Sequence, residues 1–189
     1  MRPGGGKAKG ATFERLVCVA LSKWVSNGER DDLFWRSAMS GGRATVGRKK
    51  GVERSAQSGD ISIIDSKGSP LADVFSIECK TYEDLHLDNL VYGGKAGAPT
   101  FWTQCKRDAE QAGKLPFLVA KQNRKDILLG LSQEGMTLLQ ASPIASYPRH
   151  DLHLFFFEEF LTENIFMLGA QSEKKITRVR LALNRPGKG

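Results

Sequence analysis

The sequence predicts one α/β domain built around a mixed β-sheet, with elements in the order αβββαβ and further elements towards the C-terminus. Three observations support this prediction. An apolar pattern of helical period opens the chain, short alternating segments between turn residues follow, and a second helical pattern leads into two apolar runs. A chain of 189 residues can bury a sizeable core in one domain, and it contains no internal repeat.

The first helix is predicted over residues 11–25, where apolar residues recur every three or four positions and Thr12 is a suitable N-cap. The apolar positions are Phe13, Leu16, Val17, Ala20, Leu21, Trp24 and Val25. Residues 1–10 are rich in Gly and Lys, which predicts a flexible basic arm. The domain is therefore expected over residues 11–170, with a basic tail at 171–189.

Three strands are predicted next. Residues 33–39 are short and aromatic, residues 60–65 alternate, and residues 74–80 alternate again after the turn sequence SKGSP. We expect the second and third strands to pair as a hairpin. Before the second strand lies a basic, glycine-rich segment without periodicity, residues 43–58, which predicts a loop or flap.

The second half of the chain is predicted to continue with a helix over residues 101–112. Two buried strands follow at residues 115–123 and 126–132. The apolar segment 152–168 holds half of the ten phenylalanines and fits either a strand or a helix. It could bury core or form a dimer surface, and we favour the core.

The net charge of +7 is concentrated in three segments. Residues 1–10, 43–58 and 171–189 together carry a net charge of +12, so the rest of the chain is about −5. An acidic body with basic loops and tails fits a polyanionic partner, nucleic acid first. A solvated basic surface is equally compatible with the charge alone.

Three cysteines without CxxC spacing predict neither a disulfide framework nor a zinc site, and they indicate a reducing compartment. No apolar run is long enough to cross a bilayer, and no signal-peptide core follows the basic N-terminus. His150 and His153 flank Asp151, but no third ligand lies nearby in the sequence, so solvated loop histidines are the better interpretation. We therefore expect no membrane partner.

Two acids and a lysine are predicted to converge at one end of the second and third strands. Side chains alternate along a strand, so Glu78 and Lys80 share one face. In a hairpin, Asp60 would lie near Glu78. Two close carboxylates repel unless a cation intervenes, and Mg²⁺ prefers oxygen ligands, with the carbonyl of Cys79 as a candidate third ligand. Lys80 could then hold or deprotonate a water molecule.

The same short pattern also arises by chance from a surface Glu–Lys pair and an unrelated Asp. Other residues of the chain make a functional site the better interpretation of this pattern. Glu14 lies at the inward edge of the apolar face of the first helix, although a first-turn acid also favours the helix dipole. Arg36 and Ser40 precede a Gly-Gly pair and the basic flap, although Arg36 could be an ordinary strand-edge charge.

These residues carry a resemblance to a known group of proteins. The stretches GATFERLVCVAL, FWRSAMSGG, SGDISII and SIECKTY, over about residues 10–82, resemble the PD-(D/E)XK nuclease superfamily. Within it they are most similar to the archaeal-type Holliday-junction resolvases and their phage relatives. The resemblance implies a restriction-endonuclease-like mixed sheet flanked by helices. Gly59 stands where the motif has proline, and the last fifty residues match nothing in that family.

The resemblance implies a Mg²⁺-dependent DNA endonuclease, with Mn²⁺ as a substitute ion, that acts on branched DNA as a homodimer in the cytoplasm of a bacterial or phage-infected cell. The residues that it implies to be catalytic are Glu14, Asp60, Glu78, Lys80 and Gln104. The implied metal ligands are Asp60, Glu78, Glu14 and the backbone carbonyl of Cys79. The residues expected to contact DNA are Arg36, Ser40, Arg43, Arg48, Lys49, Lys50, Arg54, Lys121 and Arg124.

Some of these assignments have simpler alternatives. Gln104 resembles a glutamine of the RecB-like exonuclease branch, but a polar helix face explains it equally well. Loop cations are the simpler interpretation of Lys121 and Arg124. Two other functions also stay open at this point: a RecB-like exonuclease acting on single strands or ends, and a catalytically silent DNA-binding protein of the same fold.

Overall fold

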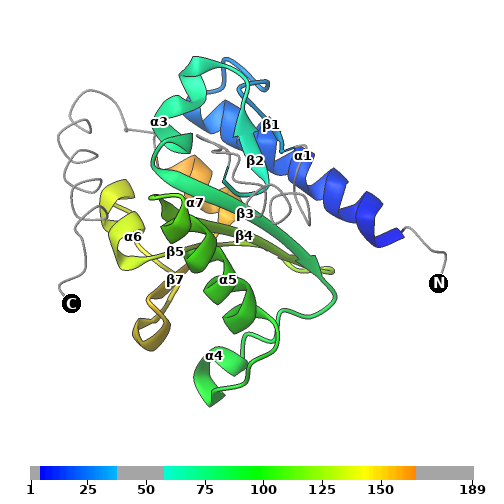
Figure 1. Cartoon of the computed structure of the whole chain (residues 1–189), viewed down its shortest axis with the longest axis vertical. Helices are drawn as coiled ribbons and strands as arrows, with labels where there is room; N and C mark the ends of the chain where they lie inside the picture. Colours follow the sequence, from blue (N-terminus) through cyan, green and yellow to red (C-terminus); the bar gives the residue numbers. More distant parts are fainter. Residues whose placement is uncertain (1–4, 38–57, 165–189) are drawn as a thin grey trace.

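A five-stranded mixed sheet forms the centre of the protein (Figure 1). The computed structural model describes residues 5–37 and 58–164. In this part of the chain the sheet has the strand order β3-β4-β5-β7-β6. The strands are β3 (Phe75–Tyr82), β4 (Leu115–Gln122), β5 (Ile127–Leu131), β6 (Ala145–Tyr147) and β7 (Leu152–Phe156). Strands β3 and β4 are parallel, and the other neighbours are antiparallel.

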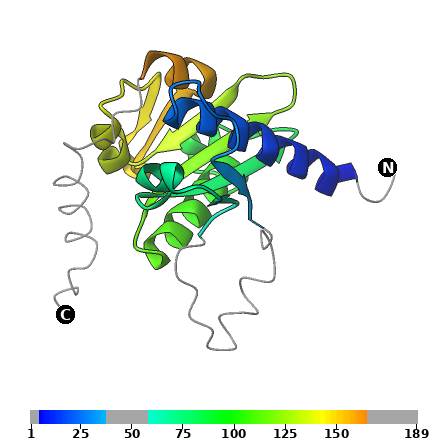
Figure 2. The ribbon, with the colours of Figure 1, turned by 90° about the horizontal axis from the view of Figure 1, so that it is seen from above.

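Helices cover both faces of this sheet. Helix α5 (Ala98–Gln111) is the crossover between the parallel strands β3 and β4, as a parallel pair requires. Helices α1 (Gly5–Val25) and α7 (Phe157–Glu163) pack on the opposite face (Figure 2). Because both faces are covered, β3 and β4 are buried along most of their length, and β4 is largely apolar.

The first helix begins earlier than the sequence predicted. Helix α1 starts at Gly5, so half of the expected arm is helical and Thr12 lies inside the helix instead of capping it. Lys and Ala are good helix formers, and extending a helix that is already anchored through its apolar face costs little. The C-terminal end is close to the prediction, where the Gly28 N–H donates to the Lys23 carbonyl at 2.7 Å.

The predicted hairpin between the second and third strands is wrong. Strand β2 (Ile61–Ile63) pairs with β1 (Phe34–Arg36) in a separate antiparallel sheet. The chain then forms a 3-10 turn, η1 (Ser66–Gly68), and a short helix, α3 (Ser69–Ala72), before β3. The Asp65 side chain accepts a hydrogen bond from the Lys67 N–H, which favours this helical turn over a tight reversal.

The apolar segment near the C-terminus is a strand as far as Phe156 and a helix from Phe157. Phe155, Phe157 and Phe160 are all buried in the core beside α1, which confirms the predicted core role for them. Phe166 lies outside the described residues. The remaining elements are α4 (Asn89–Tyr92), α6 (Gln133–Leu139) and η2 (Pro148–His150).

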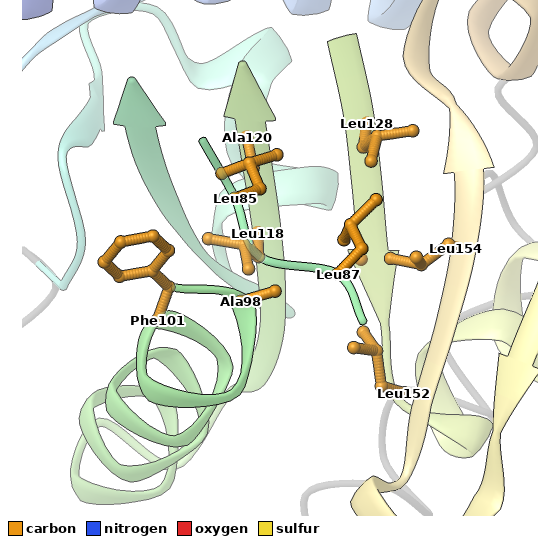
Figure 3. A pocket seen from close by; sticks show the side chains of 10 residues that line it. Leu85, Leu87, Ala98, Phe101, Leu118, Ala120, Leu128, Leu152 and Leu154 are labelled. Atoms are coloured by element: carbon orange, nitrogen blue, oxygen red, sulfur yellow. The ribbon is translucent and has the colours of Figure 1, made fainter. Parts of the chain in front are cut away.

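A second apolar cluster lies between α5 and the sheet, where it leaves a cavity of about 20 Å³ (Figure 3). The side chains around it come from the start of α5, from the preceding loop and from β4, β5 and β7. A cavity of this size has room for about one water molecule, so α5 is closely packed on the sheet. This packing fixes the helix over the face of β3 that carries Glu78.

Three free thiols, Cys18, Cys79 and Cys105, are all buried in the described part of the chain. Within the same ranges no helix combines the length and the apolar character needed to cross a membrane.

Candidate active site

Strand β3 carries two of the predicted residues. Alternation directs Ile77 and Cys79 to the α1 side, and it directs Glu78 and Lys80 to the α5 side. Burial raises the pKa of Cys105 in α5, and Glu78 raises it further while Lys80 opposes the shift. Glu78 therefore lies under α5. Because β3 is the edge strand of its sheet, the backbone groups on its other side are available to β2.

Asp60 lies against this edge and is held through three hydrogen bonds. Its N–H donates to the Ile77 carbonyl at 2.8 Å, and its carbonyl accepts from the Ser37 N–H at 2.8 Å. Its Oδ2 accepts from the Cys79 N–H at 2.9 Å. The N–H and C=O of one strand residue point to the same edge, so the Cys79 carbonyl also faces Asp60. Asp60 and Glu78 thus meet through a parallel bridge between Gly59 and Ile77.

This bridge explains why a glycine, and not the proline of the motif, precedes Asp60. Gly59 has φ +81°, and a Cβ placed there would lie 2.2 Å from the Ile77 carbonyl oxygen. Proline is fixed near −65° and cannot adopt this conformation. The absence of the motif proline is therefore a requirement of the local backbone.

The Asp60 carboxyl group is electrostatically unusual. Burial, together with the charges of Glu78 and Glu14, raises its pKa to about 7. The Cys79 N–H and the Lys80 ammonium offset only part of this effect. A buried carboxylate beside a second one is stabilised when a cation binds between them.

Glu78 and Lys80 form a largely buried ion pair, with 2.7 Å between Oε1 and Nζ. Burial alone would lower the pKa of Lys80, but the charge and hydrogen bond of Glu78, together with Asp60, outweigh it and raise the pKa above its ordinary value. Lys80 is therefore an ammonium at neutral pH. In this state Lys80 can hold a water molecule by hydrogen bonding.

Glu14 and Arg36 meet beside Asp60, although 22 positions separate them in the chain. Glu14 Oε2 and Arg36 Nε lie 2.5 Å apart, from α1 and β1 respectively. Both side chains are partly buried, Glu14 more than Arg36. In this arrangement Arg36 pairs with Glu14, whose charge also acts on Asp60.

The donor set fits a hard divalent cation. Within residues 5–37 and 58–164, no three His, Cys, Asp or Glu side chains gather as a complete metal cluster. The available oxygen donors are the carboxylates of Asp60 and Glu78 and the carbonyl of Cys79. Mg²⁺ keeps several waters and needs only one or two protein carboxylates, so this set is sufficient for it.

The comparison with protein families agrees with this geometry. Residues 5–156 match the family described as phage putative PDDEXK endonuclease. The chain belongs to this family. The match runs from α1 to the end of β7, and it confirms the predicted PD-(D/E)XK superfamily. No curated protein and no solved structure was found to match.

Gln104 makes no contact with the two carboxylates in the part of the chain that the structure describes. It precedes Cys105 in α5 and lines a hollow on the outward side of the helix, with Thr100 and Arg107. Within the described residues it makes no hydrogen bond to Asp60 or Glu78. The predicted catalytic role therefore has no contact to support it.

The predicted DNA contacts are only partly within the described structure. Lys121 pairs in register with Thr81 and points to the face opposite Lys80. Arg124 lies in the exposed turn after β4 with φ +60°. Six predicted contacts lie outside the described residues: Ser40, Arg43, Arg48, Lys49, Lys50 and Arg54.

The sequence did not identify Ser37 as a residue that supports the site. Its N–H holds the Asp60 carbonyl, and its hydroxyl lies 2.6 Å from the hydroxyl of Ser62 on β2. The residue directly follows Arg36, so correct pairing of β1 with β2 would have identified it. Ser37 thus links the two-stranded sheet to the site.

Proposed function

We propose that the protein is a Mg²⁺-dependent DNA endonuclease that hydrolyses phosphodiester bonds, with Mn²⁺ able to replace Mg²⁺. One observation carries this proposal: Asp60, Glu78 and Lys80 converge at the free edge of β3, with the Cys79 carbonyl facing the same point. Membership of an endonuclease family supports the same chemistry.

The residues divide the work of hydrolysis between them. Asp60 and Glu78 would hold the cation, which supplies Lewis acidity towards the phosphate and the attacking water. Lys80 donates hydrogen bonds that orient this water or a phosphate oxygen. The water oxygen forms a new bond to phosphorus and gives up a proton to solvent, while one ester P–O bond breaks and the leaving oxygen takes up a proton from solvent to become a hydroxyl group. A phosphate of bound DNA would compete with Glu14 for the guanidinium group of Arg36.

The proposed substrate is branched DNA of the Holliday-junction type. The resemblance to junction resolvases supports this choice, together with the concentration of positive charge in three segments of the sequence. Symmetric cutting of a junction needs two active sites related by a two-fold axis. A C2 homodimer is the simplest assembly that provides them.

The test is incubation of the protein and Mg²⁺ with a four-way junction labelled in turn on each strand, beside linear and circular duplexes. We expect paired, symmetric nicks in the junction and intact duplexes. Degradation from ends with a resistant circle would indicate an exonuclease instead. Equal cutting of plain duplex would overturn junction specificity, and binding without any cutting would indicate a catalytically silent DNA-binding protein.

Substitution of the site tests whether these residues perform the reaction. Asp60→Ala, Glu78→Ala and Lys80→Ala should each lower the cleavage rate by about a hundredfold or more, because each removes transition-state stabilisation. DNA binding should be retained in all three. Lys67→Ala, an exposed lysine on η1, is the matched control and should cut like the wild type. Full activity in any of the three site variants would refute the assignment.

A further inference from the structure

A second polar hollow lies on the outward side of α5, outside the carboxylate site. Its volume is about 410 Å³. Four of its side chains, Thr100, Thr103, Gln104 and Arg107, have the spacing of one helix face. Lys95 and His150 extend its wall from neighbouring segments.

The chemistry of this hollow is that of an anion site. Its lining combines cations, hydroxyl groups and an amide, and no carboxylate is part of the lining. Arg107 pairs with the acid that follows it in the chain: its Nε lies 3.2 Å from Oδ1 of Asp108. The Arg107 side chain in this pair is 62% exposed to solvent. Such an exposed pair is weak, so the guanidinium can turn to another anion. The Lys106 ammonium adds a further cation nearby, donating to the His150 carbonyl at 2.9 Å.

An exposed aromatic residue precedes the lining of the hollow in the chain. Tyr92 is 84% exposed, the most of any large hydrophobic residue in the described ranges. It ends α4, and Gly93 with φ +84° turns the chain into Gly94, which lines the hollow. A Cβ on Gly94 would overlap the Asn89 amide, so the turn is tightly packed. The backbone of Tyr92 is thus fixed two residues from the lining of the hollow.

The hollow and the carboxylate site lie on opposite sides of one helix. Gln104 lines the hollow and precedes Cys105, which is buried on the sheet side of α5. Thr100 lies four residues earlier, or about 6 Å further along the helix axis. Gly94 and Lys95 extend the lining to the segment that follows α4.

We propose that this hollow binds a backbone phosphate of an unpaired DNA strand, with the adjacent base stacked on Tyr92. The cations of Lys95 and Arg107, without a carboxylate in the lining, suit a phosphate, and an exposed ring suits the face of an unpaired base. The hydroxyl groups of Thr100 and Thr103 already donate to the Lys95 and Pro99 carbonyls, so the two cations carry the anion binding. In a paired duplex the bases stack on one another and cannot reach the ring. The hollow accordingly favours DNA with an unpaired strand. The identity of the ligand as DNA rests on the proposed function.

The charge of the hollow is tested with Lys95→Gln/Arg107→Gln in the full chain. Binding is measured by fluorescence anisotropy in EDTA, on a forked DNA with an unpaired arm and on a paired duplex of equal length. We expect about tenfold weaker binding to the fork, with a salt slope flatter by roughly 1.4, since each single-strand contact contributes about 0.7. Lys23→Gln/Lys67→Gln removes the same charge elsewhere and should stay within about twofold of wild type.

The ring is tested separately. Tyr92→Ala should weaken binding to the fork about tenfold and leave the duplex unchanged, whereas Tyr92→Phe should bind like the wild type. Equal losses on fork and duplex would overturn the proposal, and so would pocket variants that bind like the control. Unchanged melting temperatures for all variants exclude unfolding as the cause.

Cleavage by the wild-type protein is recorded in parallel, so that the two proposals fail independently. A protein that cuts DNA while its Lys95, Arg107 and Tyr92 variants bind the fork normally would overturn the hollow alone. A protein that cuts nothing, yet loses fork binding in these variants, would overturn the nuclease function and support the hollow.

Discussion

Asp60 destabilises the metal-free protein through its own charge. Its pKa in the folded protein is about 7 against an ordinary value of 3.8, so between these values the folded state binds more protons than the unfolded state. The free energy of unfolding therefore falls as the pH rises from about 4 to about 7. The ionised Asp60 carboxylate therefore lowers the stability of the folded protein until a cation or a proton neutralises its charge.

Asp60→Asn should remove this burden, since the amide oxygen can still accept from the Cys79 N–H. In EDTA we expect the variant to be more stable than wild type by on the order of 4 kcal/mol at pH 8, because the pKa shift of Asp60 corresponds to about 1.4 kcal/mol per pKa unit. The advantage should be small near pH 4.5. Urea unfolding at both pH values measures it, with Asp126→Asn in an exposed turn as the control. An advantage independent of pH would contradict the expectation.

The Glu14–Arg36 pair should contribute measurably to stability because both groups are partly buried. A double-mutant cycle with Glu14→Gln and Arg36→Gln should give a coupling free energy of roughly 1–2 kcal/mol. Arg107–Asp108 is the comparison pair, with Arg107 62% exposed, and it should give less than about 0.5 kcal/mol. Equal coupling in the two cycles would mean that burial does not strengthen the Glu14 pair.

At the residue scale, the sequence predicted which side chains share one face of a strand, but it did not predict the contacts between side chains of different elements. Alternation along one strand was enough to place Glu78 with Lys80, and the structure confirms this pair. The Glu14–Arg36 contact could not be predicted, because it depends on how a helix packs across a strand. Helical periodicity likewise showed that Gln104 faces outward or sideways without deciding what it meets.

At the scale of elements, the predicted order of helix and strands was largely correct, but the pairing was not. Hydrophobic periodicity shows which side chains share a face, and it carries no information on which strand lies alongside. Asp60 still lies near Glu78, since a parallel bridge at Gly59 brings the two together as a hairpin would have done. The extra turns of α1 escaped prediction because glycines and lysines carry no apolar pattern.

Gly59 should be the most sensitive glycine of this bridge. Gly59→Ala combines a positive φ with a Cβ that would lie 2.2 Å from the Ile77 carbonyl oxygen. We expect a loss of roughly 3 kcal/mol in unfolding free energy, together with loss of cleavage. Gly28→Ala is the matched control, with φ +88° and open space around it, and should cost about 1 kcal/mol. Similar losses in both variants would show that the bridge tolerates displacement.

At the scale of the whole molecule, charge rather than fold should govern DNA affinity. The basic segment at residues 43–58 was predicted to contact phosphates, and most of it lies outside the described residues. Replacing Arg48, Lys49 and Lys50 together with Gln should weaken binding to all duplex sequences alike. It should flatten the slope of log K against log salt by up to about 2.7, at about 0.9 per contact. An unchanged slope in a salt titration would exclude this segment from the interface.

The hydrogen bonds of Asp60 make one residue the junction between two sheets of very different size. Strands β1 and β2 form only three residue pairs, so this small sheet should open locally at a lower free energy than the five-stranded sheet. Each opening releases Ser37 from Asp60 and frees the Cys79 amide. In hydrogen–deuterium exchange these two amides should therefore exchange sooner than that of Val119 in the central strand β4. On gentle heating, the arrangement of Asp60 beside Glu78 would be lost while most of the backbone amides of the protein were still protected.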